Sequence, residues 1–180
     1  MKEKIEDIRR AMEAGAYQSA LCLALTLPDI CAIVQYGKDE RVGERYAAWC
    51  NEHVIPRYFP DYNKMEKDDV DYPVFDGRAC YMLRCKVLHE SNVSIDCEKN
   101  ILIDQFDLCA TNAGMDELGF AVSMGTDVDV YANGEHRKGN TMTIDISYLC
   151  SSLGQAAIEF YAKHDNKQAF EGHTIVFRKL

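Results

Sequence analysis

Hydrophobic residues recur at helical spacing along the first third of the chain. Residues 2–14 are apolar at positions 5, 8, 11 and 12, and this spacing of three and four predicts an amphipathic helix. Residues 16–34 are apolar on nearly every side, which is typical of a helix buried in a core. Pro28 lies inside this stretch and is expected to kink or divide the helix. Residues 42–53 predict a third helix, with Tyr46, Trp49 and Cys50 facing inward.

A fourth amphipathic pattern covers residues 78–90. Charged side chains alternate there with apolar positions at Tyr81, Leu83, Val87 and Leu88. Asp76 precedes the pattern and is predicted to cap the start of the helix. Ser91 and Asn92 follow it and supply a stop signal. The sequence therefore predicts a helix with one apolar face and one charged face.

The hydrophobic period changes to two between residues 100 and 146. Strand-like runs cover residues 100–109, 118–124, 128–131 and 142–146. Turn signals separate them at residues 112–114 and 132–134, and the second is typical of a hairpin. We therefore expect a small antiparallel sheet between the helices.

The last helical pattern begins at Asp145 or Ser147 and continues to Tyr161 or Lys163. The pattern at residues 173–177 predicts a short strand or an ordered tail. Together the patterns predict a mainly α fold, with a single domain over residues 1–180. In this fold an antiparallel bundle of four to five helices carries a small antiparallel β insert at about residues 100–146.

Charge and hydropathy narrow the classes of function. The formal net charge is −9, whereas non-specific binders of long nucleic acid are usually basic because they neutralise phosphates. An RNA substrate would therefore need a local cluster of cations or a partner protein. No apolar run approaches the roughly 18 residues that span a bilayer. Acidic residues precede the most apolar stretch, residues 20–27, which argues against a signal peptide. We expect a cytoplasmic protein with no membrane segment.

Eight cysteines are spread along the chain, and no Cys-x2-Cys pair occurs. This spacing matches neither a zinc site nor the disulfide framework of a small secreted domain. Cys22, Cys50, Cys80 and Cys150 lie inside apolar helical patterns, where a thiol packs as a small hydrophobe. We therefore expect reduced thiols, no metal and no cofactor.

Candidate chemistry is concentrated at the end of the fourth helix, at Arg84, His89 and Glu90. A guanidinium presents a planar fork of donors to phosphate, and an imidazole titrates near neutral pH. On a regular helix, however, residues five apart lie roughly 140° from each other, so the two side chains converge only if the helix ends or bends near Leu88. The structural alternative is that Arg84 pairs with an acidic neighbour and His89 caps the helix C-terminus.

This Arg-x4-His pattern late in a helix of a helical chain resembles the HEPN superfamily, whose active members are metal-independent ribonucleases. The resemblance implies a homodimer in which Arg84 and His89 of both copies line a shared cleft. It also implies that His89 moves the proton of a ribose 2′-hydroxyl, that Arg84 stabilises the transition-state phosphate, and that Glu90 can orient an imidazole. The products would be a 2′,3′-cyclic phosphate and a 5′-hydroxyl. Family members commonly carry Asn, Asp or His directly after the Arg, where this chain has Cys85.

The runs at residues 24–31 and 83–90 also resemble a group of small bacterial proteins, a likeness that implies no activity. The competing interpretation is therefore a non-catalytic helical module that binds a partner protein, for example an antitoxin, or a small ligand. The acidic segment at residues 60–76 would then be a docking surface. Exposure of Arg84 and His89 together in a concave site favours the nuclease. A carboxylate that holds Arg84 under the β insert favours the binding module.

Overall fold

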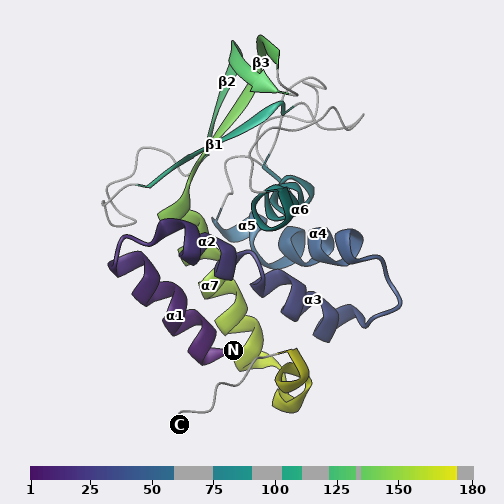
Figure 1. The fold of residues 1–180 in the computed structure, drawn as a ribbon. Helices are drawn as coiled ribbons and strands as arrows, with labels where there is room; N and C mark the ends of the chain where they lie inside the picture. The colour runs from purple at the N-terminus through teal and green to yellow at the C-terminus, as the bar shows by residue number, and fades with distance from the viewer. Residues whose placement is uncertain (59–74, 91–102, 111–121, 133–134, 174–180) are drawn as a thin grey trace.

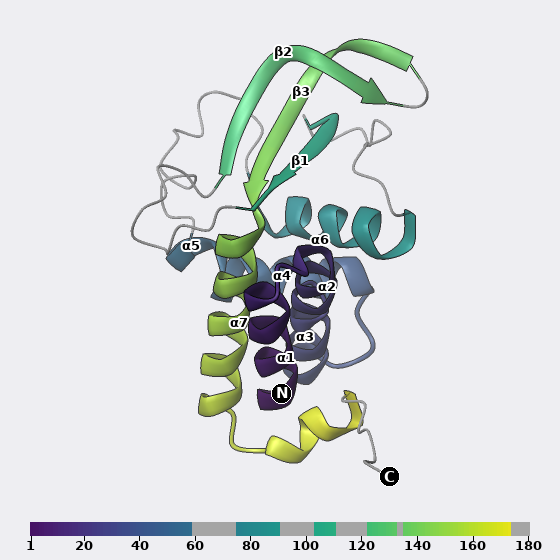
Figure 2. The ribbon, with the colours of Figure 1, turned by 60° about the vertical axis from the view of Figure 1, so that its left-hand side comes forward.

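The computed structural model describes residues 1–58, 75–90, 103–110, 122–132 and 135–173. Over these residues the protein is mainly helical and carries a small three-stranded mixed sheet. Figures 1 and 2 show the helices gathered in one part of the molecule and the sheet standing above them, with α6 (Gly77–Cys85) crossing between the two. The acidic segment lies almost entirely outside the described residues.

The first apolar segments form three helices, α1 (Lys2–Glu13), α2 (Tyr17–Ala24) and α3 (Leu27–Tyr36). Gly15, at a φ of 71°, makes the turn that lets α2 pack against α1. The predicted long helix over residues 16–34 is divided, as Pro28 suggested. The division precedes the proline, because Pro28 lies in the first turn of α3, where its missing N–H breaks no helical bond.

The next helix, α4 (Val42–His53), has the bounds that the sequence predicted, and a single turn, α5 (Ile55–Tyr58), follows it. Asp76 caps α6, since its Oδ1 accepts a hydrogen bond from Ala79 N at 2.8 Å. The predicted helix over residues 78–90 is not α-helical throughout. Its last part, η1 (Lys86–Glu90), is a π-helix, in which backbone bonds join residues five apart.

The sheet contains β1 (Gln105–Cys109), β2 (Val122–Ala132) and β3 (Glu135–Asp145), in the order β1-β3-β2. The predicted hairpin is confirmed, because β2 and β3 are antiparallel and Ala132 pairs with Glu135. The prediction of a purely antiparallel sheet is wrong, since β1 runs parallel to β3. β3 takes the central place, so β1 pairs in parallel with a strand that does not directly follow it in the chain.

Two of the predicted strands are one continuous strand. Residues 122–124 of the first run and all of the second, residues 128–131, fall on β2, whose pairing with β3 shifts register between Gly125 and Val128, and residues 118–121 lie outside the described residues. Asp127 has a φ of 53° at this bulge. The small and polar residues that looked like a break in the sequence are therefore an irregularity inside one strand. The predicted turn at residues 112–114 lies outside the described residues.

The chain passes from β3 into α7 (Ile146–Lys163) without a loop. Asp145 ends the strand and caps the helix, as the sequence predicted, because its Oδ1 accepts a bond from Tyr148 N at 2.8 Å. A 3-10 helix, η2 (Lys167–His173), follows and ends at the first residue of the predicted strand or tail. The rest of that prediction, residues 174–177, lies outside the described residues.

One cluster of buried side chains joins the helices to the sheet. On β3, Met142 and Ile144 are buried while Thr141 and Thr143 are partly exposed, which is the alternation expected of a sheet with one covered face. The largest fully buried side chains are Trp49, Tyr46, Phe75, Phe106, Phe170, Leu21, Leu25, Leu27, Leu83, Met142 and Ile144. The antiparallel bundle of four to five helices stays a prediction.

All seven cysteines in the described part of the chain are free thiols, in agreement with the sequence prediction. Cys31, Cys50, Cys80 and Cys150 are buried, and Cys22 is partly exposed. Burial raises the pKa of the Cys150 thiol from 9.0 to about 12, because a thiolate would lose its solvation there.

The segment Tyr17–Tyr36 is long and apolar enough to cross a membrane by length and composition, with a mean hydropathy of 1.5. It extends beyond the shorter apolar run at residues 20–27 that stood out in the sequence. Half of it is buried inside the fold, and it is divided between α2 and α3. Asp29, its only charged residue, forms an ion pair with Arg84 of α6. These are properties of a core segment of a globular fold.

Candidate functional site

Close packing against α4 fixes the position of α6. A Cβ atom at Gly77 would lie 2.1 Å from the backbone oxygen of Ala47, so only glycine permits this approach. The backbone N–H of Gly77 donates to Asn51 Oδ1 at 2.7 Å. Further along, the rings of Tyr46 and Tyr81 lie 5.3 Å apart. The start and middle of α6 are therefore held on α4, and its last turn carries Arg84 to the side of α3.

The π-helix brings the two predicted site residues together. Nη1 of Arg84 lies 2.5 Å from Nε2 of His89. The wider turn of η1 removes the separation of roughly 140° that a regular helix would impose on residues five apart. Because a guanidinium has donors only, His89 Nε2 is the acceptor. A hydrogen bond between these two atoms therefore requires the tautomer with its proton on Nδ1.

Asp29, from the first turn of α3, holds the other side of the guanidinium. Its Oδ2 accepts from Nε of Arg84 at 3.0 Å and lies 3.0 Å from Nη2. The side chains are 17% exposed for Arg84 and 22% for Asp29, so water screens the pair only partly. Burial raises the pKa of Asp29, and the charge of Arg84 opposes this shift. The second oxygen, Oδ1, is buried and has no hydrogen-bond partner in the described structure.

These contacts form a chain of three side chains, Asp29, Arg84 and His89. Asp29 and Arg84 are both half-buried, and His89 is exposed at the surface. Arg84 therefore does pair with an acidic neighbour, as the structural alternative expected, but the carboxylate comes from α3 rather than from beneath the β insert. The remaining edge of the Arg84 guanidinium contacts the exposed imidazole of His89.

Among the described residues, Glu90 forms an ion pair with Lys86 and no hydrogen bond with His89. Its carboxylate accepts from Lys86 Nζ at 2.7 Å, and the described structure contains no hydrogen bond between Glu90 and the imidazole. The Lys86 side chain is only 13% exposed, so it does not extend into solvent. The π-helical turn places Lys86 alongside Glu90.

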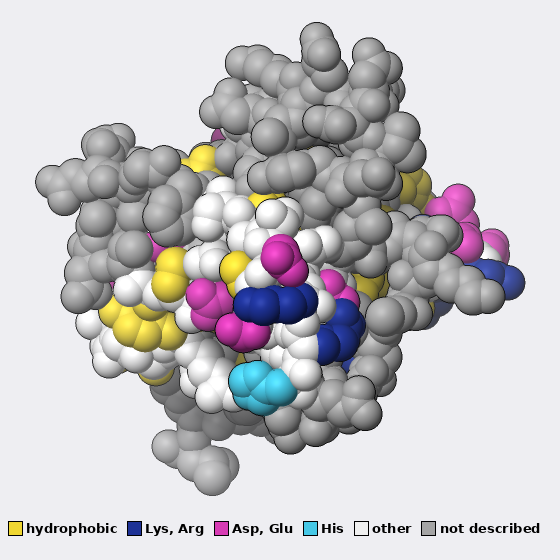
Figure 3. All heavy atoms as spheres, turned by 90° about the horizontal axis from the view of Figure 1, so that it is seen from above, with side chains coloured by type: hydrophobic (Ala, Val, Ile, Leu, Met, Phe, Trp, Pro, Cys, Tyr) yellow, Lys and Arg dark blue, Asp and Glu magenta, His cyan; other side chains and the backbone are white. Residues whose placement is uncertain are grey.

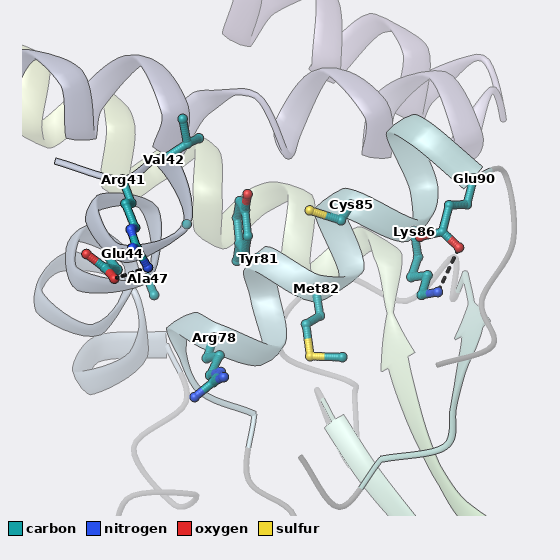
Figure 4. Close-up of a pocket in the computed structure, with 11 residues that line it drawn as sticks. Arg41, Val42, Glu44, Ala47, Arg78, Tyr81, Met82, Cys85, Lys86 and Glu90 are labelled. Atoms are coloured by element: carbon teal, nitrogen blue, oxygen red, sulfur yellow. Dashed lines mark hydrogen bonds and ion pairs between the residues drawn. The ribbon is translucent and has the colours of Figure 1, made fainter. Parts of the chain in front are cut away.

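A cavity of about 810 Å³ borders this helix. Figure 4 shows Tyr81 and Cys85 on one side of α6, Arg78 and Met82 on the other, and the start of α4 at one end. Arg84 and His89 do not line the cavity, whereas Cys85 and Glu90, their neighbours in sequence, do. The cavity and the Asp29–Arg84–His89 chain therefore occupy adjacent sides of one helix.

Cys85, the residue where HEPN members commonly carry a polar side chain, faces this cavity beside Tyr81. Burial and a hydrogen bond with Cys85 raise the pKa of Tyr81, so its hydroxyl stays protonated at neutral pH. A longer polar side chain at this position would extend into the cavity.

Charges on the sheet are balanced locally. Lys138 lies 3.0 Å from Asp129, and Arg137 forms an ion pair with Asp104. Figure 3, which looks down on the sheet end, shows positive and negative side chains next to one another beside a histidine. The described side chains of this face therefore form no cationic cluster of the kind that an acidic chain would need to hold RNA.

Two parts of the site escaped the sequence analysis. Asp29 could have been noticed as the single charge in a 20-residue apolar segment, because such a charge needs a partner. The cavity combines side chains from α4 and α6, and nothing in the sequence indicates how these helices cross. Comparison with known proteins finds no match for this chain among protein-family models, curated proteins or solved structures.

Proposed function

We propose that this protein is a metal-independent endoribonuclease of the HEPN type, with Arg84 and His89 as its catalytic residues. The observation that carries the proposal is the contact between Arg84 Nη1 and His89 Nε2. It places a half-buried, phosphate-binding cation beside a base that is exposed at the surface. Both are required for attack of a 2′-hydroxyl on the adjacent phosphodiester.

The proposed reaction begins when an RNA phosphate takes the place of His89 on Nη1 of Arg84. Freed of this donor, His89 Nε2 accepts the proton of the ribose 2′-hydroxyl, and O2′ forms a bond to phosphorus. The bond from phosphorus to O5′ breaks as Arg84 stabilises the added negative charge. The leaving O5′ receives a proton from an imidazolium, on the same ring or on that of a second copy, giving a 2′,3′-cyclic phosphate and a 5′-hydroxyl.

Asp29 is the positioning residue in this proposal. Two donors of Arg84 are occupied by Asp29 Oδ2, and this fixes which edge of the guanidinium faces the surface. Preorganised donors stabilise a transition state better than mobile ones, because they need no reorientation during the reaction. Glu90 contributes by holding Lys86 beside the site.

The proposal includes a homodimer that buries part of the helix from Arg78 to His89, inside an antiparallel helical bundle. A chain with a net charge of −9 needs a focused cleft to bind RNA, and two copies would bring two Arg84 side chains into one cleft. The free thiols suit the reducing cytoplasm. Light scattering at tens of micromolar tests the assembly, and a monomer there would argue against both dimer and nuclease.

The test of function is cleavage of a labelled RNA pool, with end-group analysis for cyclic phosphate. Cleavage should persist in EDTA, and Arg84→Ala or His89→Ala should each reduce it by about 10²–10⁴-fold. His173→Ala and Arg10→Ala are matched controls, because they remove the same groups at the end of η2 and on α1. Cys85→Asn should leave the rate equal or raise it. Activity that survives in both alanine variants at positions 84 and 89, or vanishes with EDTA, would refute the proposal.

A second function is favoured by one observation, the ion pair between Arg84 and Asp29. An arginine bound this way also serves to join two helices, and the protein would then be a helical module that binds a partner protein. Failure of the wild type to cleave any RNA in the pool, with Arg84→Ala unfolding more easily than wild type, would favour this module.

A further inference from the structure

The cavity beside α6 has the size and lining of a ligand site. Its volume of about 810 Å³ lies within the range of small-molecule and cofactor pockets, roughly 300–1,000 Å³. The Tyr81 ring and the Arg78 side chain both line it, on different sides of α6. An aromatic surface together with a cation is the combination that holds an unstacked base and its phosphate.

Arg78 is the cation that remains available to a ligand. Of the other cations on the cavity wall, Lys86 is bound to Glu90 at 2.7 Å, and Arg41 lies 3.8 Å from Glu44. Arg78 is exposed and has no hydrogen bond or ion pair in the described part of the chain. A planar guanidinium without an internal partner suits a phosphate oxygen pair.

Glycine at position 43 keeps the aromatic wall in place. A Cβ atom there would lie 2.7 Å from Cε1 of Tyr81, so the first turn of α4 packs directly on the edge of the ring. Tyr81 is also packed against Tyr46. The ring is therefore held rigidly, and a base that contacts it would not need to order a mobile side chain.

We propose that this cavity binds one nucleotide of the RNA substrate, with the base on Tyr81 and a phosphate on Arg78. The inference rests on the proposed ribonuclease function, because it makes the cavity a subsite beside Arg84 and His89. The cavity and the pair of Arg84 and His89 border the same continuous helix, formed by α6 and η1. Because the diameter of a helix is about 10–12 Å, a single strand that crosses it would contact both the cavity and the pair. The recognised chemistry is an aromatic base with a phosphate, from single-stranded RNA or from a free mononucleotide.

Binding to a fluorescent single strand of about twelve nucleotides tests the proposal, within the site sizes of single-strand binders. Its riboses carry 2′-O-methyl groups, so no cleavage interferes. Tyr81→Ala should weaken affinity by about 5- to 100-fold, with an unchanged salt dependence, whereas Tyr81→Phe should bind like wild type. Arg78→Gln should reduce the slope of log K against log salt by about 0.7, because one phosphate contact is lost. Arg10→Gln, the same charge change on α1, should leave the slope as in wild type.

Affinities of Tyr81→Ala and Arg78→Gln within two-fold of wild type would overturn the subsite. If the wild type still cleaves RNA in that case, the proposed ribonuclease function is retained and only the nucleotide subsite is rejected. Lost binding in these variants, with no cleavage by the wild type, would leave a nucleotide site in a protein that is not a nuclease. Competition by uridine or adenosine monophosphate identifies a free nucleotide as the ligand. Tyr81→Ala that dissociates a dimer without changing RNA affinity would assign the cavity to a subunit contact and overturn the proposal.

Discussion

The ion pair between Asp29 and Arg84 should contribute measurably to folding as well as to the site. A solvent-exposed pair contributes about 0–1 kcal/mol, and breaking a fully buried pair costs about 3–5 kcal/mol. With 22% and 17% of their side chains exposed, Asp29 and Arg84 lie between these limits. We expect Asp29→Ala and Arg84→Ala each to lower the free energy of unfolding by about 2 kcal/mol. For a chain of this length that corresponds to a decrease in Tm of about 4–8 °C.

A double-mutant cycle separates the pair from the packing of each side chain. Urea unfolding of the wild type, both single variants and the double variant gives the coupling energy, which should be about 1–2 kcal/mol. The double variant should be little less stable than either single variant, because the second substitution removes a group that the first left without a partner. A coupling below about 0.5 kcal/mol would show that the contact has no energetic role, and the anchoring of Arg84 by Asp29 would be refuted.

The pH dependence of Arg84→Ala gives a second check on the same pair. Burial already raises the pKa of Asp29, and loss of the guanidinium removes the charge that opposes this rise. A carboxyl whose folded pKa lies above its unfolded value contributes most at low pH and loses this contribution as pH rises through the folded pKa. The difference in free energy of unfolding between wild type and Arg84→Ala should therefore be smaller near pH 5 than at pH 7. A difference that does not depend on pH would contradict the burial of Asp29.

Three further predictions concern the packing of α6 on α4 and the stability of α7. Gly77→Ala should destabilise by about 3 kcal/mol and reduce RNA cleavage, because its Cβ would displace α6 from the backbone of α4, whereas Gly172→Ala meets no atom within 4 Å and should be neutral in thermal unfolding. Asp145→Ala should cost about 1–2 kcal/mol by removing the cap of α7, and Asp145→Asn should restore most of it in the same urea experiment. The Cys150 thiol keeps its proton in the folded state up to about pH 12, whereas the unfolded chain releases it from about pH 9. The contribution of this thiol to the free energy of unfolding is therefore complete below pH 9. Above pH 9 it is lost by up to about 1.4 kcal/mol per pH unit. Cys150→Ala should flatten the alkaline decrease in stability by this amount, whereas Leu153→Ala, a core variant of the same helix, should lower stability without changing the slope.

Local signals account for the elements that the sequence predicted well. The bounds of α4 follow from its apolar spacing, and the starts of α6 and α7 follow from Asp76 and Asp145 as caps. Each signal involves residues only a few positions apart, so it can be recognised without knowing the fold. The order of the strands cannot, because the choice of β3 rather than β2 as the partner of β1 depends on contacts across the whole chain.

The sequence drew attention to Arg84 and His89 but predicted neither their geometry nor their anchor, Asp29. Arg84 and His89 were chosen for their chemistry, and regular helical geometry then argued against their convergence. The π-helix that resolves this conflict has no residue signature, since its wider turn is a property of the backbone. Asp29 carried a clear signal, a lone charge among apolar residues, yet only the fold shows that Arg84 is its partner.

The π-helix makes the site sensitive to chain length. An α-helix becomes a π-helical turn when one residue is inserted, and the turn reverts when one residue is removed. Deleting a single residue between Lys86 and Leu88 would therefore restore regular winding and bring His89 to the spacing of i,i+4 from Arg84, on the same face without the wide turn. Inserting one would rotate His89 away by about 100°. A change in the number of residues between Arg84 and His89 must therefore be accompanied by a change in the winding of this helix. Such a change alters the relative position of the two side chains rather than the length of a loop.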